Sequence, residues 1–474
     1  MRYRPKTKPF PHQSRAVIRA VRHRNYGVFM EPRLGKTKTA IDIANIWALK
    51  ADDDEPYRVL VVAPKIAMDV WWDELSKHCT LDYSVENFEE YEGDGETFQW
   101  FIAGREETFR ATRKGKELHR PKQKELEEWD PHIIFLDESH QYKRPGGRGA
   151  QDAWRMVRRL RERRGDGTPY VVLLSGTPNP KGWRDLFAQF RIMDSTVFGT
   201  NAGDFDEEYC IYGHGPRRYQ VVAYKNEEKL LKKVRRHSIA VSAEQAGLAG
   251  HQEWQTIRVT LPDGAMKLYR KFADDMLANF QGEEILAKNA GVRRLRLLQI
   301  AGGFLTNGTR VHGAKVRAVE EWCRLLVEQG EPVILYCRFL PEVHAVGEAA
   351  ERGGYRVRVI EGATRGVDRR RAIQAFQARQ GSTPMALVFQ IQTGSQAIEL
   401  SAGAEVGYYS TPDGWVEYWQ SLNRVRGPNQ KRPVRYTHFI ATGTVDVSAM
   451  GGLRNKEDWH QTMMRNPRRY LLGL

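Results

Sequence analysis

Hydrophobic positions gather in two series of short runs along the chain, each run followed by a polar loop and then by sequence of helical period. The runs are rich in Val, Ile, Leu and Phe, which is typical of strands buried on both faces of a parallel sheet. The first series comprises 26–30, 58–63, 132–137 and 170–175, and the second comprises 332–337, 356–360, 386–390, 406–410 and 435–440. The pattern predicts an α/β fold with two parallel-sheet lobes.

The sequence between the two series has a different character. Residues 179–311 look helix-rich and strand-poor, with the clearest helical stretches at 227–236 and 265–280. Residues 89–130 are very polar and charged, which indicates an insertion or long loops within the first lobe. We therefore predict three parts, namely lobe one at 1–195, helical protrusions and the inter-lobe connection at 196–311, and lobe two at 312–474.

The charge balance adds a candidate partner. Among 474 residues, Lys and Arg number 74 against 59 Asp and Glu, so the formal net charge is +15. Such a surplus favours a polyanion such as nucleic acid. Basic residues are dense at 141–164 and from Arg424 onward.

Composition also bears on the cellular compartment in which the protein is expected. No segment approaches the run of about 18 apolar residues that a membrane helix needs, and the basic N-terminus has no apolar stretch behind it. The cysteines are far apart and form no CxxC pair, which argues against a zinc finger or a disulfide framework; they are Cys79, Cys210, Cys323 and Cys337. We expect reduced thiols in a soluble cytoplasmic protein, of a bacterial cell or a virus-infected host cell, without a membrane partner.

The first apolar run leads into a candidate phosphate-binding loop. The segment 31–39 contains Gly-Lys-Thr and precedes an apolar helix, which is the context that a GxxxxGK[ST] loop requires. Backbone N–H groups at the helix start would cradle phosphates, here those of Leu34, Gly35, Lys36, Thr37 and Lys38. Lys36 would add a point charge and Thr37 would ligate magnesium. Met30 replaces the first glycine of the pattern.

Two further runs end in polar residues suited to the same chemistry. The run 132–136 ends in Asp137-Glu138-Ser139-His140. Asp137 would hold magnesium, and Glu138 would orient and deprotonate the attacking water. The run 170–174 ends in the segment 175–178, Ser-Gly-Thr-Pro, whose small hydroxyl residues can sense the state of the γ-phosphate.

These motifs, in this order, resemble the superfamily-two helicases and within them the Snf-type (Swi/Snf-related) DNA translocases, in a compact bacterial or viral-like form. The resemblance spans nearly the whole chain. Gln13 looks like the adenine-reading glutamine, 59–75 like motif Ia, Asp-Glu-Ser-His like the DEAH box, 333–340 like motif IV and 393–446 like motifs V and VI joined. The resemblance implies two RecA-like lobes with helical insertions between them, and hydrolysis of ATP, with Mg²⁺, between the lobes.

The last motif departs from the family pattern QxxxRxxRxGQ. Gln420, Arg424 and Gln430 fall in place, but Gly427 occupies the second arginine position and Arg426 stands one residue early. The resemblance therefore assigns Arg424 as the arginine finger. Arg426 is a second catalytic candidate, although a shift of one residue on a helix would turn its side chain by about 100°. Arg33 stands where the eukaryotic remodellers usually carry glycine.

The function that the resemblance implies is a DNA-dependent ATPase that moves along or remodels double-stranded or branched DNA, without sequence preference. Candidate contacts to the DNA backbone are Lys65, Arg338 and Arg365, each of which fits an ordinary solvated charge equally well. Two alternatives stay open, namely a helicase that unwinds single-stranded DNA or RNA substrates, and a nucleotide-gated DNA-binding protein with little ATPase activity. We expect a monomer that works beside replication, recombination or repair proteins.

Overall fold

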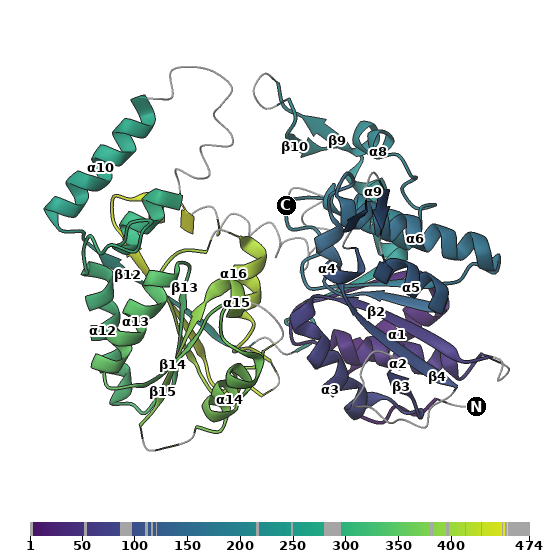
Figure 1. Ribbon diagram of the computed structural model, residues 1–474, viewed down its shortest axis with the longest axis horizontal. Helices are drawn as coiled ribbons and strands as arrows, with labels where there is room; N and C mark the ends of the chain where they lie inside the picture. Colours follow the sequence, from purple (N-terminus) through teal and green to yellow (C-terminus); the bar gives the residue numbers. More distant parts are fainter. Residues whose placement is uncertain are drawn as a thin grey trace. The chain divides into compact units, whose positions relative to one another are not determined.

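The chain folds into two compact units, a first unit of residues 1–247 and a second unit of residues 248–459, coloured purple to teal and teal to yellow in Figure 1. The computed structural model describes residues 3–51, 55–85, 97–109, 112–114, 117–119, 121–214, 218–247, 250–278, 295–379, 381, 383–394, 398–412, 414–427, 429–447, 449–450 and 453.

The first unit is built on a seven-stranded parallel sheet in the order β11-β1-β8-β7-β2-β4-β3. All five residues of β1 and all four of β7 are buried, which explains why their sequences are continuous apolar runs. The strands are β1 (Tyr26–Met30), β2 (Tyr57–Ala63), β3 (Ser84–Val85), β4 (Phe98–Gly104), β7 (Ile133–Leu136), β8 (Tyr170–Ser175) and β11 (Ser238–Val241).

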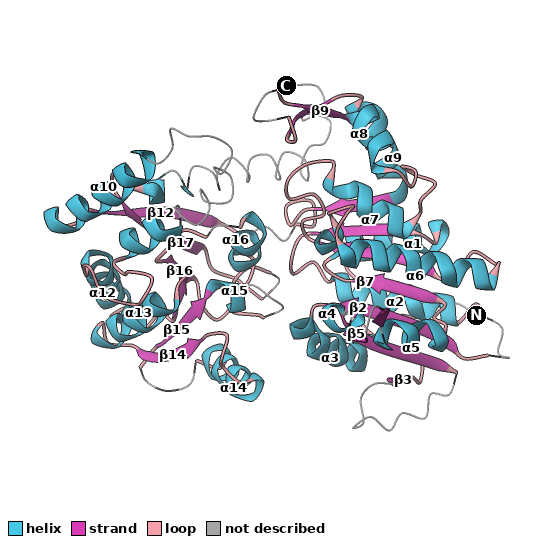
Figure 2. Cartoon of the chain, turned by 45° about the horizontal axis from the view of Figure 1, so that its top comes forward, coloured by secondary structure: helices cyan, strands magenta, loops and turns pink. Residues whose placement is uncertain are grey.

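Helices and two small hairpins complete the first unit (Figure 2). The helices α1, α2 and α3 pack in succession, as do α5, α6 and α7. The helices are α1 (Pro11–His23), α2 (Lys36–Ala48), η1 (Lys65–Ala67), α3 (Met68–His78), α4 (Arg105–Thr108), α5 (Pro121–Trp129), η2 (Ser139–Tyr142), α6 (Arg148–Arg164), α7 (Asp185–Met193), α8 (Ala202–Tyr209) and α9 (Glu227–His237). The antiparallel hairpins are β5 (Thr112–Lys114) with β6 (Glu117–His119) and β9 (Cys210–Tyr212) with β10 (Val221–Tyr224).

The second unit has a six-stranded parallel sheet in the order β12-β17-β16-β13-β15-β14. Alternate residues of β13 enter two cores, with Ile334 and Tyr336 on one face and Val333 and Leu335 on the other. Helices α12 and α13 contribute to the second core, and α14 and α16 to the first. The elements are β12 (Gln252–Val259), α10 (Asp263–Ala278), α12 (Ala314–Val327), β13 (Val333–Cys337), α13 (Leu340–Arg352), β14 (Arg356–Ile360), α14 (Gly366–Gln377), β15 (Met385–Gln390), α15 (Ile391–Gly394), β16 (Glu405–Tyr408), α16 (Trp415–Leu422) and β17 (Val434–Ala441).

The predicted α/β fold with two parallel-sheet lobes is confirmed. Every predicted strand is present, with ends that differ by at most two residues, and the predicted helices appear as α9 and α10. Residues 279–280 of the second predicted helix and 454–474 of predicted lobe two lie outside the described residues.

Two expectations about the polar regions were wrong. Residues 89–130 were expected to form an insertion or loops, yet they contain β4, which pairs with β2 along seven residues. Its apolar sequence FQWFIAG is short and surrounded by charged residues, which hid it. The region expected to be strand-poor contains β11 and β12. Strand β11 belongs to the sheet of the first unit, and β12 belongs to the sheet of the second unit. The predicted middle part, 196–311, is thus divided between the units at residue 247.

Two further features bear on the sequence analysis. All four cysteines are buried free thiols, as expected. Across the portion of the chain that the structure describes, no helix is both long and apolar enough to cross a membrane.

Candidate active site

Three neighbouring strands of the first unit end at one edge of its sheet. In the order β1-β8-β7, they lead into the Gly-Lys-Thr loop, the Ser-Gly-Thr-Pro segment and the Asp-Glu pair. The carboxyl ends of parallel strands are where open α/β sheets bind ligands. The fold therefore brings together three segments that are separated by up to about 140 residues in the sequence.

The loop depends on a close contact between Gly35 and Gln13. Gly35 is the N-cap of α2 and has a left-handed backbone with φ of 78°. A Cβ atom on this residue would lie only 2.1 Å from Gln13 Nε2. His12 Nε2 and Gln13 Nε2 contact the carbonyl oxygen of Leu34, at 2.9 Å and 3.1 Å. Gln13 thus lies against the loop, as its predicted role requires, and His12 is an additional contact that the sequence analysis did not single out.

Lys36 and Thr37 occupy the first turn of α2. The Lys36 ammonium group donates to the carbonyl oxygen of Met30 at 3.0 Å. Met30, at the position of the missing glycine, is fully buried and faces the core with its side chain. Its backbone still serves the loop, so the departure from the glycine pattern leaves the geometry intact.

Lys38 plays a different part from Lys36. Its ammonium group forms a buried ion pair with Asp42 at 2.6 Å, and Asp42 also accepts a hydrogen bond from the Tyr3 hydroxyl at 2.7 Å. The Lys38 side chain is therefore engaged within α2. Only its backbone N–H, near the helix N-terminus, is suited to a phosphate.

Arg33 has the backbone of a glycine position. Its φ is 71°, in the left-handed region where most residues are strained. The structure thus explains why a glycine is usual at this position of the loop.

Asp137 is held by three neighbours. Its Oδ2 accepts a hydrogen bond from Trp71 Nε1 at 2.9 Å, and its Oδ1 accepts one from the backbone N–H of Glu138 at 2.9 Å. Burial and the adjacent Glu138 carboxylate raise the pKa of Asp137, whereas the Trp71 hydrogen bond and the positive charge of Lys36 lower it. Lys36 and Asp137 are thus electrostatic neighbours at the sheet edge.

Trp71 has two roles. It packs in the core, with its side chain buried against Phe135 of β7. The hydrogen bond to Asp137 was missed, because a tryptophan in an apolar segment gives no signal for a distant carboxylate.

His140 connects the Asp-Glu segment with the segment after β8. Its Nδ1 lies 3.2 Å from Glu138 Oε2 and 3.2 Å from Ser175 Oγ. The Ser175 hydroxyl also accepts a hydrogen bond from the backbone N–H of Thr177 at 3.1 Å. Glu138 itself has a left-handed backbone, with φ of 49°, which a non-glycine residue adopts only when its surroundings enforce it. The sequence analysis did not assign a role to His140.

Gly176 brings the third segment against the loop. A Cβ atom on Gly176 would lie 3.1 Å from Cδ of Pro32 and 3.3 Å from the carbonyl oxygen of Met30. A larger residue would push the two segments apart. The glycine in Ser-Gly-Thr-Pro is therefore a close-packing position.

Arg424 and Arg426 lie in the second unit and are both buried. Arg424 Nη1 donates to the carbonyl oxygen of Ile398 at 3.4 Å, and Arg426 Nη1 donates to Asn423 Oδ1 at 3.1 Å. The comparison of the two arginines by rotation around a helix was wrong, because α16 ends at Leu422 and both arginines follow it.

The three candidate backbone contacts differ in exposure. Lys65 and Arg365 are highly exposed and pair only with exposed or half-exposed acids, Glu107 and Asp368. Arg338 is half-buried, and its guanidinium group lies over the Phe339 ring at 5.3 Å. Lys65 and Arg365 can thus reach an external ligand more readily than Arg338.

Several known proteins are similar to this chain. One is the RNA polymerase-associated protein RapA of Vibrio vulnificus (strain CMCP6), 29% identical over 158 residues, which cover 32% of this chain and 15% of the relative. Another is the SWI/SNF-related matrix-associated actin-dependent regulator of chromatin subfamily A-like protein 1 of Drosophila melanogaster, 25% identical over 336 residues, which cover 69% of this chain and 40% of the relative. The chain thus spans less than half the length of either relative.

A solved structure, the Sulfolobus solfataricus SWI2/SNF2 ATPase core in complex with dsDNA, is 17% identical and matches 100% of this chain and 96% of that chain, with a TM-score of 0.43. The family model of the SNF2-related domain matches residues 13–299, which is more than half of the sequence and includes the whole site of the first unit. The chain therefore belongs to the SNF2-related domain family, as its motifs predicted.

Proposed function

We propose that this protein is an ATP-driven motor that moves along or remodels double-stranded or branched DNA. The observation that carries the proposal is the convergence of Lys36, Asp137 and Glu138 at the carboxyl ends of β1 and β7, which flank β8 in the sheet. Family membership supports it. So do two relatives, an RNA polymerase-associated protein and a SWI/SNF-related regulator of chromatin.

The residues present fit ATP and Mg²⁺. Gly35 adds no side chain of its own at the start of α2, where Gln13 lies against it. The Lys36 ammonium group donates to the Met30 carbonyl oxygen at the loop, and a bound phosphate would replace that contact. Within the described ranges, no cluster of three His, Cys, Asp or Glu residues could hold a metal alone. This suits Mg²⁺, which binds through one or two protein oxygens together with phosphates and water. Thr37 and Asp137 would hold it, and when bound it neutralises charge on the phosphates.

The side chains of the first unit have different roles in ATP hydrolysis. Lys36 binds and orients the phosphates, because its ammonium group lies at the loop, on the Met30 carbonyl oxygen. Glu138 orients the attacking water and accepts its proton, while His140 fixes the Glu138 carboxylate from the side of Ser175. Trp71 holds the Asp137 carboxylate in position by its hydrogen bond.

The nucleotide site is tested by Lys36→Ala and Glu138→Gln, with Lys50→Ala as a matched control, because Lys50 is an exposed lysine just beyond the other end of α2. Phosphate release is measured with duplex DNA, single-stranded DNA or RNA. We expect duplex DNA to stimulate the wild type and the control most, and both site variants to lose turnover while still binding DNA. Normal hydrolysis by either site variant would refute the assignment. Stronger stimulation by single strands or RNA would favour the unwinding helicase, and no hydrolysis by the wild type would favour the nucleotide-gated binding protein.

Arg424 is the residue that, by the family resemblance, would stabilise the negative charge on the phosphates in the transition state. An arginine finger contributes about 10³-fold or more to turnover. We expect Arg424→Ala to bind ATP but to lose most DNA-stimulated hydrolysis, with Arg426→Ala measured beside it. Because Arg424 is buried, Arg424→Lys is included as a variant that keeps the charge. If Arg424→Ala hydrolysed ATP normally and Arg426→Ala did not, the finger would be Arg426.

A further inference from the structure

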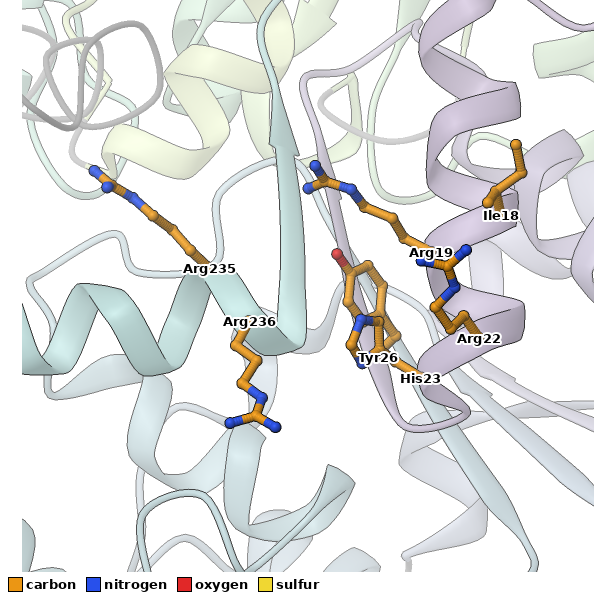
Figure 3. A pocket seen from close by; sticks show the side chains of 7 residues that line it. All are labelled: Ile18, Arg19, Arg22, His23, Tyr26, Arg235 and Arg236. Carbon is orange, nitrogen blue, oxygen red and sulfur yellow. The ribbon is translucent and has the colours of Figure 1, made fainter.

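A basic pocket lies on the first unit at the end of the sheet opposite to the nucleotide loop. It has a volume of about 270 Å³ and is lined by Arg19 and Arg22 of α1, Arg235 and Arg236 of α9, and His23 and Tyr26 between them (Figure 3). Tyr26 begins β1, and the loop follows the end of the same strand at Met30. A five-residue strand separates the two places by about 13 Å.

Sheet pairing brings together two segments that are more than 200 residues apart in the sequence. Strand β11 follows α9 directly and pairs in parallel with β1, with Gly27 opposite Ser238. The last turn of α9 is thereby placed beside the start of β1 and the last turn of α1. Figure 3 shows α1 on one side of the pocket and the end of α9 on the other.

The pocket has a buried floor and exposed walls. Tyr26 is buried and stacks on the His23 ring, with a centroid distance of 5.4 Å. Arg19 is in hydrogen-bonding contact with the Tyr26 hydroxyl, and this contact opposes the rise in the pKa of Tyr26 that burial causes. The four arginines themselves are exposed. They can therefore adjust to a ligand that rests on the floor.

In the described part of the chain, none of the four arginines forms an ion pair with a carboxylate. Two acids of neighbouring segments have partners outside the pocket: Asp194 accepts hydrogen bonds from the backbone N–H and hydroxyl of Thr196, and Glu227, at the opposite end of α9, accepts one from Trp183 Nε1. Four like charges around one pocket repel each other, so an anion would stabilise this arrangement.

We propose that this pocket binds the backbone phosphates of a nucleic acid, at a second contact surface distinct from the nucleotide site. Phosphate oxygens suit arginine because its guanidinium group can donate two parallel hydrogen bonds. A polymer is favoured over a single phosphate because exposed basic residues continue beyond the pocket, with Arg15 on α1, Arg24 directly after it and Lys232 on α9. A nucleic-acid strand presents a phosphate about every 3.4 Å and can contact several of them at once.

The experiment measures binding of a fluorescently labelled 20-base-pair duplex by anisotropy over a series of KCl concentrations. The variant is Arg22→Ala/Arg235→Ala, with one change on each wall. The control is Lys267→Ala/Arg270→Ala, which removes two exposed charges from α10 of the second unit. Each lost phosphate contact lowers the slope of log affinity against log salt by about 0.9, so we expect the slope to fall by about 2 in the pocket variant. The control should keep the wild-type slope.

Three results would overturn the proposal. One is a pocket variant with the same salt slope as the wild type. Another is a control variant whose salt slope falls as much as that of the pocket variant, which would indicate nonspecific attraction. In the third, tripolyphosphate stabilises the wild type against thermal unfolding but not the pocket variant, while both proteins bind DNA with the same affinity. The pocket would then bind small phosphates and not a nucleic acid. The proposal does not depend on ATP hydrolysis. Failure of DNA to stimulate the wild-type ATPase would therefore refute the motor function and leave this measurement interpretable.

Discussion

Replacing Gly35 by alanine places a methyl group where the structure has no room for one. The new Cβ would lie 2.1 Å from Gln13 Nε2 and 3.3 Å from Gln13 Cδ. Gln13 must therefore move, and it would lose two hydrogen bonds, one to the Leu34 carbonyl oxygen at 3.1 Å and one from the backbone N–H of Phe10 at 2.9 Å. The alanine must also adopt the left-handed backbone, with φ of 78°.

The expected loss of stability follows from these two effects. Left-handed backbone costs a non-glycine residue about 1–2 kcal/mol, and two hydrogen bonds contribute about 1–3 kcal/mol together. Gly35→Ala should thus lower the free energy of unfolding of the first unit by about 2–5 kcal/mol. Gln13→Ala alone should cost about 1–3 kcal/mol, because it removes the same hydrogen bonds without backbone strain.

The double variant gives the sharper test. With alanine at position 13 no amide group is left to collide, so Gly35→Ala/Gln13→Ala should be no less stable than Gly35→Ala alone. The assay is urea unfolding followed by hydrogen exchange of peptides from β1 and α2, which reports on the first unit. Strictly additive losses in the two single variants, or a Gly35→Ala variant as stable as the wild type, would show that the contact does not constrain the loop.

Three further predictions concern buried charges. Trp71→Phe keeps the aromatic packing but removes the hydrogen bond that lowers the pKa of Asp137, so the acid limb of the pH–rate profile of ATP hydrolysis should move up by about 1 pH unit; an unmoved limb would contradict the role of Trp71. Asp137→Asn should raise the melting temperature in EDTA at pH 8 but not near pH 4. The folded-state pKa of Asp137 is raised, so the stability that this group contributes is lost as the pH rises through that pKa. A gain in melting temperature that did not depend on pH would refute this reasoning. Asp446→Ala leaves Lys315 fully buried without its ion-pair partner at 2.8 Å, and should destabilise the second unit by about 3–5 kcal/mol in chemical unfolding, whereas a loss below 1 kcal/mol would indicate that Lys315 reaches water.

The sequence predicted the parts of the fold that follow from local periodicity. Strands such as β1 and β8 were located to the residue, because near-continuous apolar runs between polar loops indicate buried parallel strands. Edge strands carry a weaker signal. In β12, most residues are partly or fully exposed, so its sequence lacks an apolar run, and only pairing with β17 reveals it as a strand.

The residues of the site divide in the same way. Lys36, Asp137 and Glu138 were found because phosphate chemistry requires those residue types directly after strands. The residues that hold them in position were not found. Trp71 and His140 act through contacts with residues 66 and 35 positions away, and such contacts exist only once the sheet order places β7 beside both β2 and β8.

Charge density along the sequence is a poor guide to where a polyanion binds, as the arginines of α6 show. This helix lies in the densest basic segment of the first unit, yet its arginines hold the protein together through ion pairs with α5 and the residue after it, Arg159 to Glu127 and Arg163 and Arg164 to Asp130. Arg161 donates instead to backbone carbonyl oxygens of Pro169 and Met193. A charge that is paired at short range projects little field into solvent, since the partner cancels it within a few ångströms. The sparser arginines of α1 and α9 form no such pairs among the described residues, so their field extends to a ligand. The surface to test for nucleic acid is therefore the one where basic residues meet without acids, and in the first unit the pocket between α1 and α9 meets that condition.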